Sequence, residues 1–307
     1  MTAVWIGGDV RAAAISRRTL GPAAARAIAG QASMADALAV LANSPYSREI
    51  RPGQTLRSAQ HAIAAATLWN VRVLAGWVPA VGVPMMRILA GWWEIANIES
   101  QLRNDVAPPR QPYFRLGDLA VGWTRLATAT SATQLCERLA ATRWGRPDDE
   151  SPRTIGLTLR TSLLQWASTA LPASRDWVGG AAALLLARER AGGNVSLARR
   201  PARALASLLG GQALAAAALP DLVGGLPRSA RWPFLDPVAP DELWRAECRW
   251  WSRVEADGRA LLRTGEFGPL PVVGAVAVLA ADAWRVRAAL VAAANGERGV
   301  AEFDALA

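Results

Sequence analysis

Regular alternation of apolar and polar residues, which is typical of β-strands, is nearly absent from this sequence of 307 residues. Residues that favour strands are also scarce, since the whole chain has 2 tyrosines and 4 phenylalanines. One run, Thr154–Thr161, has strand-like residue preferences, but Ser151 and Pro152 before it are typical of a helix N-cap and first helical position. We therefore predict that this run is helical and that the fold class is all-α.

Further helix starts and stops are marked along the chain. Two pairs of residues have the spacing of a capping box: Ser33 with Asp36, and Ser131 with Gln134. A last long helix should begin at Pro269 and end near Ala294, because the Asn-Gly pair that follows is typical of a helix stop. The chain should consist of many helices joined by short turns that contain glycine or proline.

One of these helices, Gly91–Arg103, carries a single apolar stripe. Apolar residues recur at helical spacing, namely Trp92, Ile95, Ile98 and Leu102, with Trp93 beside them. Glu94, Asn97, Glu99, Gln101 and Arg103 are among the other positions of this helix. This pattern predicts a packing helix with no catalytic group, in which Asn97 forms hydrogen bonds within the helical interior.

Irregular segments at 106–112, 146–152, 192–200 and 226–240 separate longer helical stretches. They divide the chain into three predicted subdomains of similar size, residues 1–105, 106–195 and 196–307. Each block ends in an apolar helix with a tryptophan near an acidic residue: Trp93 and Glu94, Asp176 and Trp177, Asp282 and Trp284. The recurrence suggests an internal triplication with a long period.

The chain has no lysine, so all 34 basic residues are arginine and the net charge is +9. Residues 1–240 hold 26 arginines against 15 acidic residues, whereas residues 241–307 hold 8 against 10. This excess fits either a dispersed, solvated surface or attraction to an acidic partner or an anionic membrane. No basic stripe with interleaved aromatic residues is present, so we do not expect nucleic-acid binding.

No stretch is long enough to predict a membrane span. The uncharged runs Val73–Met86, Ala204–Pro220 and Leu270–Ala281 hold 14, 17 and 12 residues, whereas a span needs about 20 strongly apolar residues. Asp9 and Arg11 interrupt any apolar leader at the N-terminus. Cys136 and Cys248 have no spacing typical of zinc or redox sites, which fits a reducing compartment.

The sequence offers few groups for catalysis. His61 is the only histidine, so we expect a structural role for it and no activated nucleophile. Without lysine no P-loop can form, and we predict no catalytic, metal or cofactor-binding residues and no small-molecule substrate. The acidic cluster Asp148–Glu150 fits a solvated turn best, with an all-α metal-dependent enzyme as a weaker alternative. The 14 tryptophans would fill the core, or in part anchor a protein partner.

Four segments, in this order, resemble the C/d family of central-stalk proteins, which cap the rotor ring of A-type and V-type ATPases: Asp9–Gly21, Ser33–Tyr46, Gly91–Arg103 and Gly268–Leu290. Within the last two, the residues that hold the family pattern are Trp93, Ile95, Asn97, Ile98, Leu102 and Arg103, then Gly268, Pro269, Pro271, Asp282, Arg287 and Leu290. The matches cover both ends of the chain, while residues 106–195 match poorly.

This resemblance implies three similar helical subdomains in a funnel-like, pseudo-threefold arrangement. It also implies a non-catalytic, peripheral protein on the cytoplasmic face of a membrane. The implied partners are central-stalk subunits and the proteolipid rotor ring of a rotary ATPase, and the implied role is coupling the stalk to the ring for proton or sodium transport. A helical scaffold that binds other partners through its arginine-rich surface is the alternative expectation.

Overall fold

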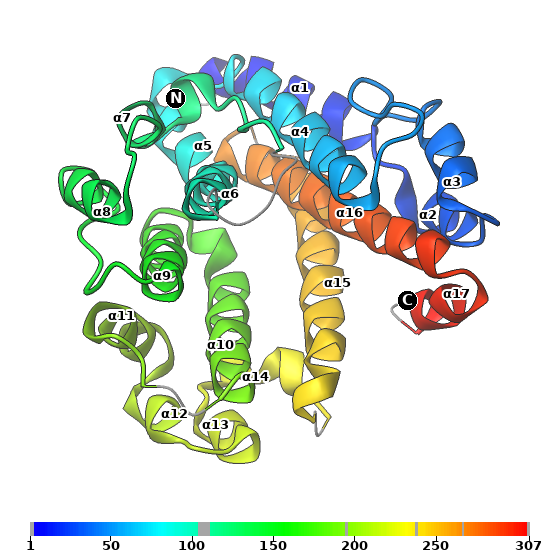
Figure 1. Ribbon diagram of the computed structural model, residues 1–307. Coiled ribbons are helices and arrows are strands. Elements are labelled where there is room, and N and C mark those ends of the chain that lie inside the picture. Colours follow the sequence, from blue (N-terminus) through cyan, green and yellow to red (C-terminus); the bar gives the residue numbers. More distant parts are fainter. Residues whose placement is uncertain (1–2, 104–110, 194–195, 237–238, 266, 306–307) are drawn as a thin grey trace. The chain divides into compact units, whose positions relative to one another are not determined.

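The computed structural model describes residues 3–103, 111–193, 196–236, 239–265 and 267–305. These residues form helices joined by turns and include no strand (Figure 1). The predicted all-α fold class is therefore confirmed. Within these same ranges, no helix combines the length and the hydropathy that crossing a bilayer requires.

The chain divides into two compact units. The first unit joins Met1–Val83 with Trp251–Ala307, and the second is Pro84–Trp250. The first unit contains α1 (Ile6–Ser16), α2 (Gly21–Ala29), α3 (Met34–Leu41), α4 (Leu56–Ala75), α16 (Pro269–Asn295) and α17 (Glu297–Asp304). The second contains α6 (Gly91–Leu102), α7 (Trp123–Leu126), α8 (Ala132–Ala140), α9 (Pro152–Ala170), α10 (Arg175–Ala191), α11 (Arg199–Leu209), α12 (Gly211–Ala215), α13 (Leu219–Gly225) and α14 (Arg228–Arg231).

Two helices cross the boundaries between the units, α5 (Val83–Leu89) and α15 (Leu243–Leu261). Short 3₁₀ turns connect several helices: Ala3–Trp5, Ala80–Gly82, Gly117–Leu119, Pro172–Ser174, Trp232–Phe234 and Pro240–Glu242. The three subdomains predicted from the sequence, 1–105, 106–195 and 196–307, stay a prediction. The predicted break at 106–112 falls largely outside the described residues.

The local signals for helix starts are confirmed by side-chain caps. The hydroxyl of Ser33 accepts a hydrogen bond from the backbone N–H of Asp36, at 3.2 Å, at the start of α3. Equivalent caps begin α8 at Ser131 and α9 at Ser151. The ambiguous run Thr154–Thr161 lies inside α9. The long helix α16 ends at Asn295, and Gly296 takes the positive φ of 65° that lets the chain turn.

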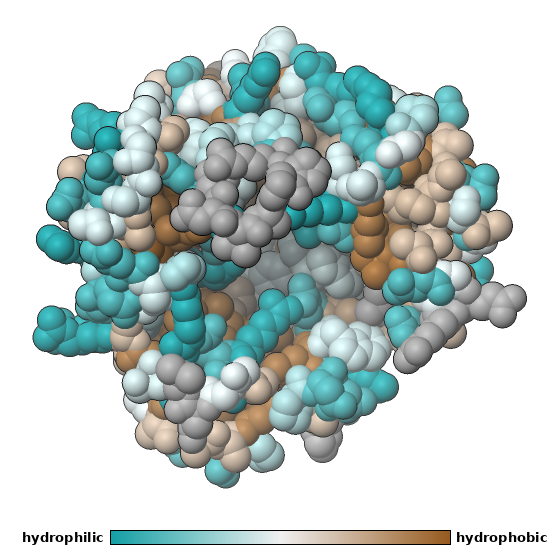
Figure 2. Space-filling model, in the orientation of Figure 1, coloured by the Kyte–Doolittle hydropathy of each residue, from teal (hydrophilic) through white to brown (hydrophobic). Residues whose placement is uncertain are grey.

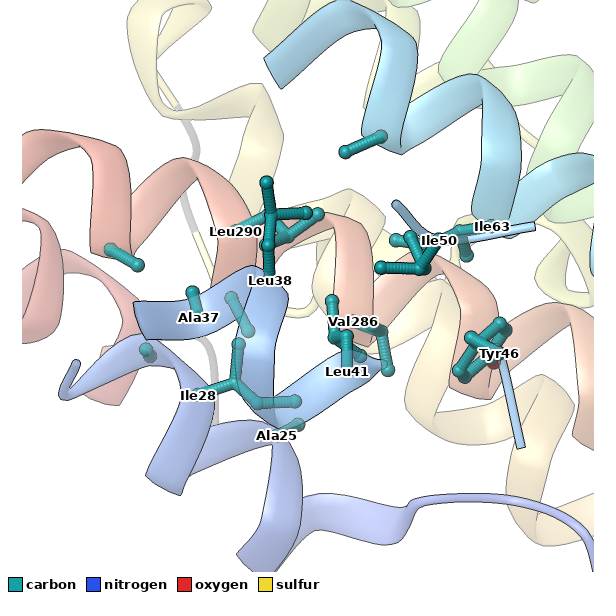
Figure 3. Close-up of a cluster of buried hydrophobic side chains, with 14 of the residues drawn as sticks. Ala25, Ile28, Ala37, Leu38, Leu41, Tyr46, Ile50, Ile63, Val286 and Leu290 are labelled. Carbon is teal, nitrogen blue, oxygen red and sulfur yellow. The ribbon is translucent and has the colours of Figure 1, made fainter. Parts of the chain in front are cut away.

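The core of the first unit forms around α16, which packs against α1, α2, α3, α4 and α17. Figure 3 shows apolar side chains from α2, α3 and α16 pointing toward one another, among them Ile28, Leu41 and Val286. Helix α15 approaches α16 through two glycines. A Cβ added to Gly274 would lie 2.5 Å from the backbone oxygen of Gly258, so only glycine allows this close crossing.

The core of the second unit forms around α9 and α10, which pack against each other, and both contact α11. Helix α6 also packs on α9, and α10 contacts α13 and α14. The apolar residues of this core come largely from α10 through α14, including Leu186, Leu205 and Leu222. Trp250 and Trp232 lie against Gly180 of α10, where an added Cβ would lie 2.8 and 2.9 Å from their rings.

A buried ion-pair cluster links α15 to α16 in the first unit. Glu255 of α15 is 8% exposed and accepts hydrogen bonds from Arg259, at 2.6 Å, and from Arg285 of α16. Burial by itself raises the pKa of Glu255, but the hydrogen bonds and positive charges of Arg285 and Arg259 outweigh it, so the pKa is lowered. The ionised carboxylate therefore stabilises the folded state.

We expect the difference in unfolding free energy between the wild type and a Glu255→Gln variant to shrink as the pH falls. The pKa of Glu255 is lower in the folded protein than the value of 4.5 for the unfolded chain. Its carboxylate therefore stabilises the fold fully above pH 4.5, and this stabilisation is lost as the pH falls through the lower pKa of the folded state. Urea unfolding between pH 7 and pH 3 measures this difference. A difference that stays constant with pH would contradict a lowered pKa for Glu255. The control is Asp257→Asn, because Asp257 lies on the same helix in an exposed pair with Arg253.

Candidate functional site

Asp282, in the middle of α16, is a buried carboxylate that holds two distant segments of the first unit. It is 1% exposed. Its Oδ1 accepts a hydrogen bond from the backbone N–H of Gly21 at 2.8 Å, and its Oδ2 accepts one from Leu20 at 3.0 Å. The hydroxyl of Tyr46 also donates to Oδ2, at 2.7 Å. The carboxylate thus anchors the start of α2, where a negative charge is favourable, and the turn after α3.

Glu94, on α6, has the same role in the second unit. It is fully buried. Its Oε2 accepts a hydrogen bond from the backbone N–H of Val121 at 2.5 Å, and its Oε1 accepts one from Gly122 at 2.7 Å. The indole Nε1 of Trp144 donates to Oε1 at 2.9 Å. Glu94 therefore anchors the start of α7 and the turn after α8.

The two anchored segments repeat in detail. Ser44 donates to the carbonyl of Leu41 and accepts from the N–H of Tyr46. Thr142 makes the same pair of bonds with Leu139 and Trp144. Ser131 follows Ser33 by 98 positions, and the same step of 98 relates Thr142 to Ser44 and Trp144 to Tyr46. Both units therefore contain one supersecondary motif: an anchoring carboxylate, a capped short helix, a hydroxyl turn and an aromatic donor.

Asp176 is the acidic residue singled out in the middle block. It is exposed in the first turn of α10. Its backbone carbonyl accepts a hydrogen bond from the indole of Trp232, at 3.3 Å. At the point where α10 meets the segment near α14, Gly179 lies against Ala230.

Burial raises the pKa of two groups in these motifs, Glu94 and Tyr46. It raises the pKa of Glu94 and outweighs the hydrogen bonds from Trp144, Val121, Gly122 and Trp123, which lower the pKa. Burial also raises the pKa of Tyr46 well above its usual value, and the charge and hydrogen bond of Asp282 raise it further. Both carboxylates are buried, and the hydrogen bonds described above join each of them to distant segments of the chain.

Glu94, one of the polar residues of Gly91–Arg103, is fully buried, which the helical pattern did not predict. The prediction that Asn97 forms hydrogen bonds in the interior is confirmed. Its amide donates to the carbonyl of Phe114 at 2.9 Å and accepts from the N–H of Phe114 at 2.7 Å. The apolar stripe is confirmed at Ile95 and Ile98, which are buried, whereas Trp92 is 46% exposed.

The acidic cluster Asp148–Glu150 lies in the turn before α9, and its three carboxylates face different parts of the chain. Asp148 accepts from the N–H of Arg200, Asp149 from the N–H of Ser151, and Glu150 from the hydroxyl of Thr133. The hydrogen bonds from Ser151 lower the pKa of Asp149. This geometry supports the solvated-turn interpretation. His61 is half-buried on α4, and the described part of the chain contains no group of three potential metal ligands.

Trp144, whose indole donates to Glu94, is fully buried, and its ring lies 4.5 Å from that of Trp166. Trp77 and Trp92, in contrast, are exposed. Both interpretations of the tryptophans, core filling and surface anchoring, therefore have residues that fit them. On the face in Figure 2, hydrophilic residues lie among apolar ones.

No protein-family model matches the sequence, and a search of curated proteins gives no match either.

Proposed function

We propose that this chain is a non-catalytic component of the central stalk of a rotary A/V-type ATPase, which couples the soluble stalk to the membrane rotor ring. In this role it lies on the cytoplasmic face of the membrane as a peripheral protein. Its partners are the central-stalk subunits and the proteolipid ring. The proposal rests on the ordered resemblance of four segments at the two ends of the chain.

The observation that carries the proposal is the place of the two carboxylate anchors within those segments. Glu94 lies in Gly91–Arg103, and Asp282 lies in Gly268–Leu290. Each makes the same set of hydrogen bonds inside its own unit. An internally repeated helical motif fits a family built from similar subdomains. We extend the proposal to a funnel-like arrangement of three such subdomains, residues 1–105, 106–195 and 196–307.

A rigid adaptor needs anchored segments more than it needs a reactive pocket. The buried carboxylates supply such anchoring, because each fixes a helix start and an aromatic side chain at once. Exposed Trp92, on the same helix as Glu94, is suited to contact a partner, since tryptophan is enriched among residues that dominate binding energy. A general helical scaffold would share the anchors but would not require stalk or ring partners.

Co-expression with central-stalk and ring subunits from the same source tests the proposal. We expect the tagged chain to co-purify with at least one of them, and we expect the isolated chain to hydrolyse no ATP. A folded sample that retains none of these subunits, or an isolated chain with robust ATP turnover, would rule the function out.

A Trp92→Ala variant sharpens this experiment. We expect it to keep its helical circular dichroism, because the side chain is half-exposed, and to weaken partner binding by about tenfold. Val40→Ala, at an exposed position on α3, is the control and should bind as the wild type does. Unchanged binding by Trp92→Ala would remove Trp92 from the interface.

A further inference from the structure

Five apolar side chains are exposed where the beginning of the first unit meets the turn after α4. They belong to the segment around α1 and to residues 76–82, and each is between 43% and 74% exposed: Val4, Ile6, Val10, Trp77 and Val81. Single exposed apolar residues are ordinary, but a group of them marks an interaction surface. We call this group the α1 surface.

Contacts between α1 and the turn place Trp77 on the surface of α1. A Cβ added to Gly7 would lie 3.4 Å from the ring of Trp77, so the indole lies directly on α1. The guanidinium of Arg11 lies 4.8 Å from the centre of the same ring. Gly7 and Arg11 are one turn apart on the helix, and Ile6 and Val10 form the adjacent row. Trp77 thus lies beside the exposed aliphatic row.

The outward face of α1 is apolar along its length and ends in positive charge. Exposed residues recur at helical spacing, and they are Ile6, Val10, Ala13 and Ala14, followed by Arg17 and Arg18. The buried face of the same helix, with Ala12 and Ile15, already packs in the core. The inner face of α1 thus packs in the core, whereas Ile6 and Val10 on the outer face are exposed.

Exposed charges on this surface have one sign. In residues 3–18 and 72–83 the single acidic residue is Asp9, which is 7% exposed and accepts a hydrogen bond from the N–H of Gly268 at 2.8 Å. Arg17, Arg18 and Arg72 are exposed, and Arg11 is half-exposed over Trp77. The surface therefore complements a partner that is negatively charged at its border and apolar inside.

We propose that the α1 surface docks on an anionic phospholipid bilayer. Ile6, Val10 and Val81 insert among the upper acyl chains, and Trp77 lies at the headgroup level, where indole rings are favoured. The arginines extend toward lipid phosphates while their methylene groups cover apolar surface. This contact goes beyond the proposed function, because it is made with lipid and requires no protein of the ring or stalk.

Sedimentation of the full-length chain with lipid vesicles tests the proposal. We expect binding to mixed vesicles of phosphatidylcholine and phosphatidylglycerol, and much weaker binding to phosphatidylcholine alone. A Val10→Asp/Val81→Asp double variant should lose about tenfold or more in affinity, because it places charge where acyl chains would lie. Arg17→Gln should lose about fivefold, as expected for one arginine at an anionic surface.

Matched controls separate the α1 surface from general changes in charge. Val40→Asp places the same charge at an exposed valine of the same unit, on α3, and Arg57→Gln removes an exposed arginine of α4. Both should bind vesicles as the wild type does. Equal losses in the variants and their controls, or equal wild-type binding to neutral and anionic vesicles, would overturn the proposal.

A protein contact on the same surface gives a different result. In that case the chain would not bind vesicles, and Val10→Asp/Val81→Asp would abolish co-purification with stalk or ring subunits. These two results together would overturn the lipid proposal and leave the proposed function standing. Conversely, vesicle binding that depends on the α1 surface, without any co-purification, would support the lipid contact and count against the rotary-ATPase function.

Discussion

Replacement of Asp282 by alanine is expected to lower the free energy of unfolding of the first unit by about 3–5 kcal/mol. The variant would leave three donors without their acceptor, namely the N–H groups of Leu20 and Gly21 and the buried hydroxyl of Tyr46. It would also remove the negative charge at the start of α2. Hydrogen exchange should therefore accelerate most in residues 20–46.

Two further variants distinguish the loss of these hydrogen bonds from the loss of a surface charge. Asp304→Ala removes an aspartate of the same unit whose pair with Arg26 is exposed, and it should change stability by less than about 1 kcal/mol. Tyr46→Phe removes only one of the three donors and should cost about 1–2 kcal/mol. Equal stability of Asp282→Ala and Asp304→Ala would show that Asp282 is no anchor.

The second large effect is expected at Glu94. Glu94→Ala should destabilise the second unit by about 3–5 kcal/mol, because Val121, Gly122 and Trp144 each lose their acceptor. Glu94→Gln should lower the free energy of unfolding by less, because the amide keeps one acceptor oxygen and carries no charge to bury. Burial already raises the pKa of the carboxyl group that it replaces. Urea unfolding followed by circular dichroism measures both.

Hydrogen exchange of individual segments allows each of the two carboxylate variants to serve as the control for the other. Glu94→Ala should accelerate hydrogen exchange in residues 121–144 and leave residues 20–46 close to the wild type, while Asp282→Ala should do the reverse. Glu137→Ala, at an exposed position of α8, should affect neither region. Acceleration spread evenly over both units in either variant would contradict the separate anchoring that we describe.

Signals that act within a few residues allowed much of the secondary structure to be predicted. Ser33, Ser131 and Ser151 each cap the helix predicted to follow them, because a cap needs only its own side chain and an N–H three residues later. The end of α16 at Asn295 was predicted for a similar reason. The ambiguous run Thr154–Thr161 was assigned correctly from the Ser-Pro pair before it.

The anchors were not predicted from the sequence, because their partners lie far along the chain. Helical periodicity places Glu94 on a polar face, because a carboxylate is expected to be solvated. The pattern within one helix carries no information about the two N–H groups, 27 and 28 positions away, that bind this carboxylate. A comparison of the chain with itself at a step of 98 positions could have revealed the motif. The paired residues differ in type, however, as Tyr46 and Trp144 do, so the signal is weak.

The distance in sequence between Asp282 and its partners also fixes an order of events during synthesis. Its hydrogen bonds to Leu20 and Gly21 span 262 and 261 positions, whereas those of Glu94 span at most 50. As the chain emerges from the ribosome, the second unit is complete before Asp282 exists. The contacts that α1, α2, α3 and α4 make with α16 can therefore form only after the whole second unit has been synthesised.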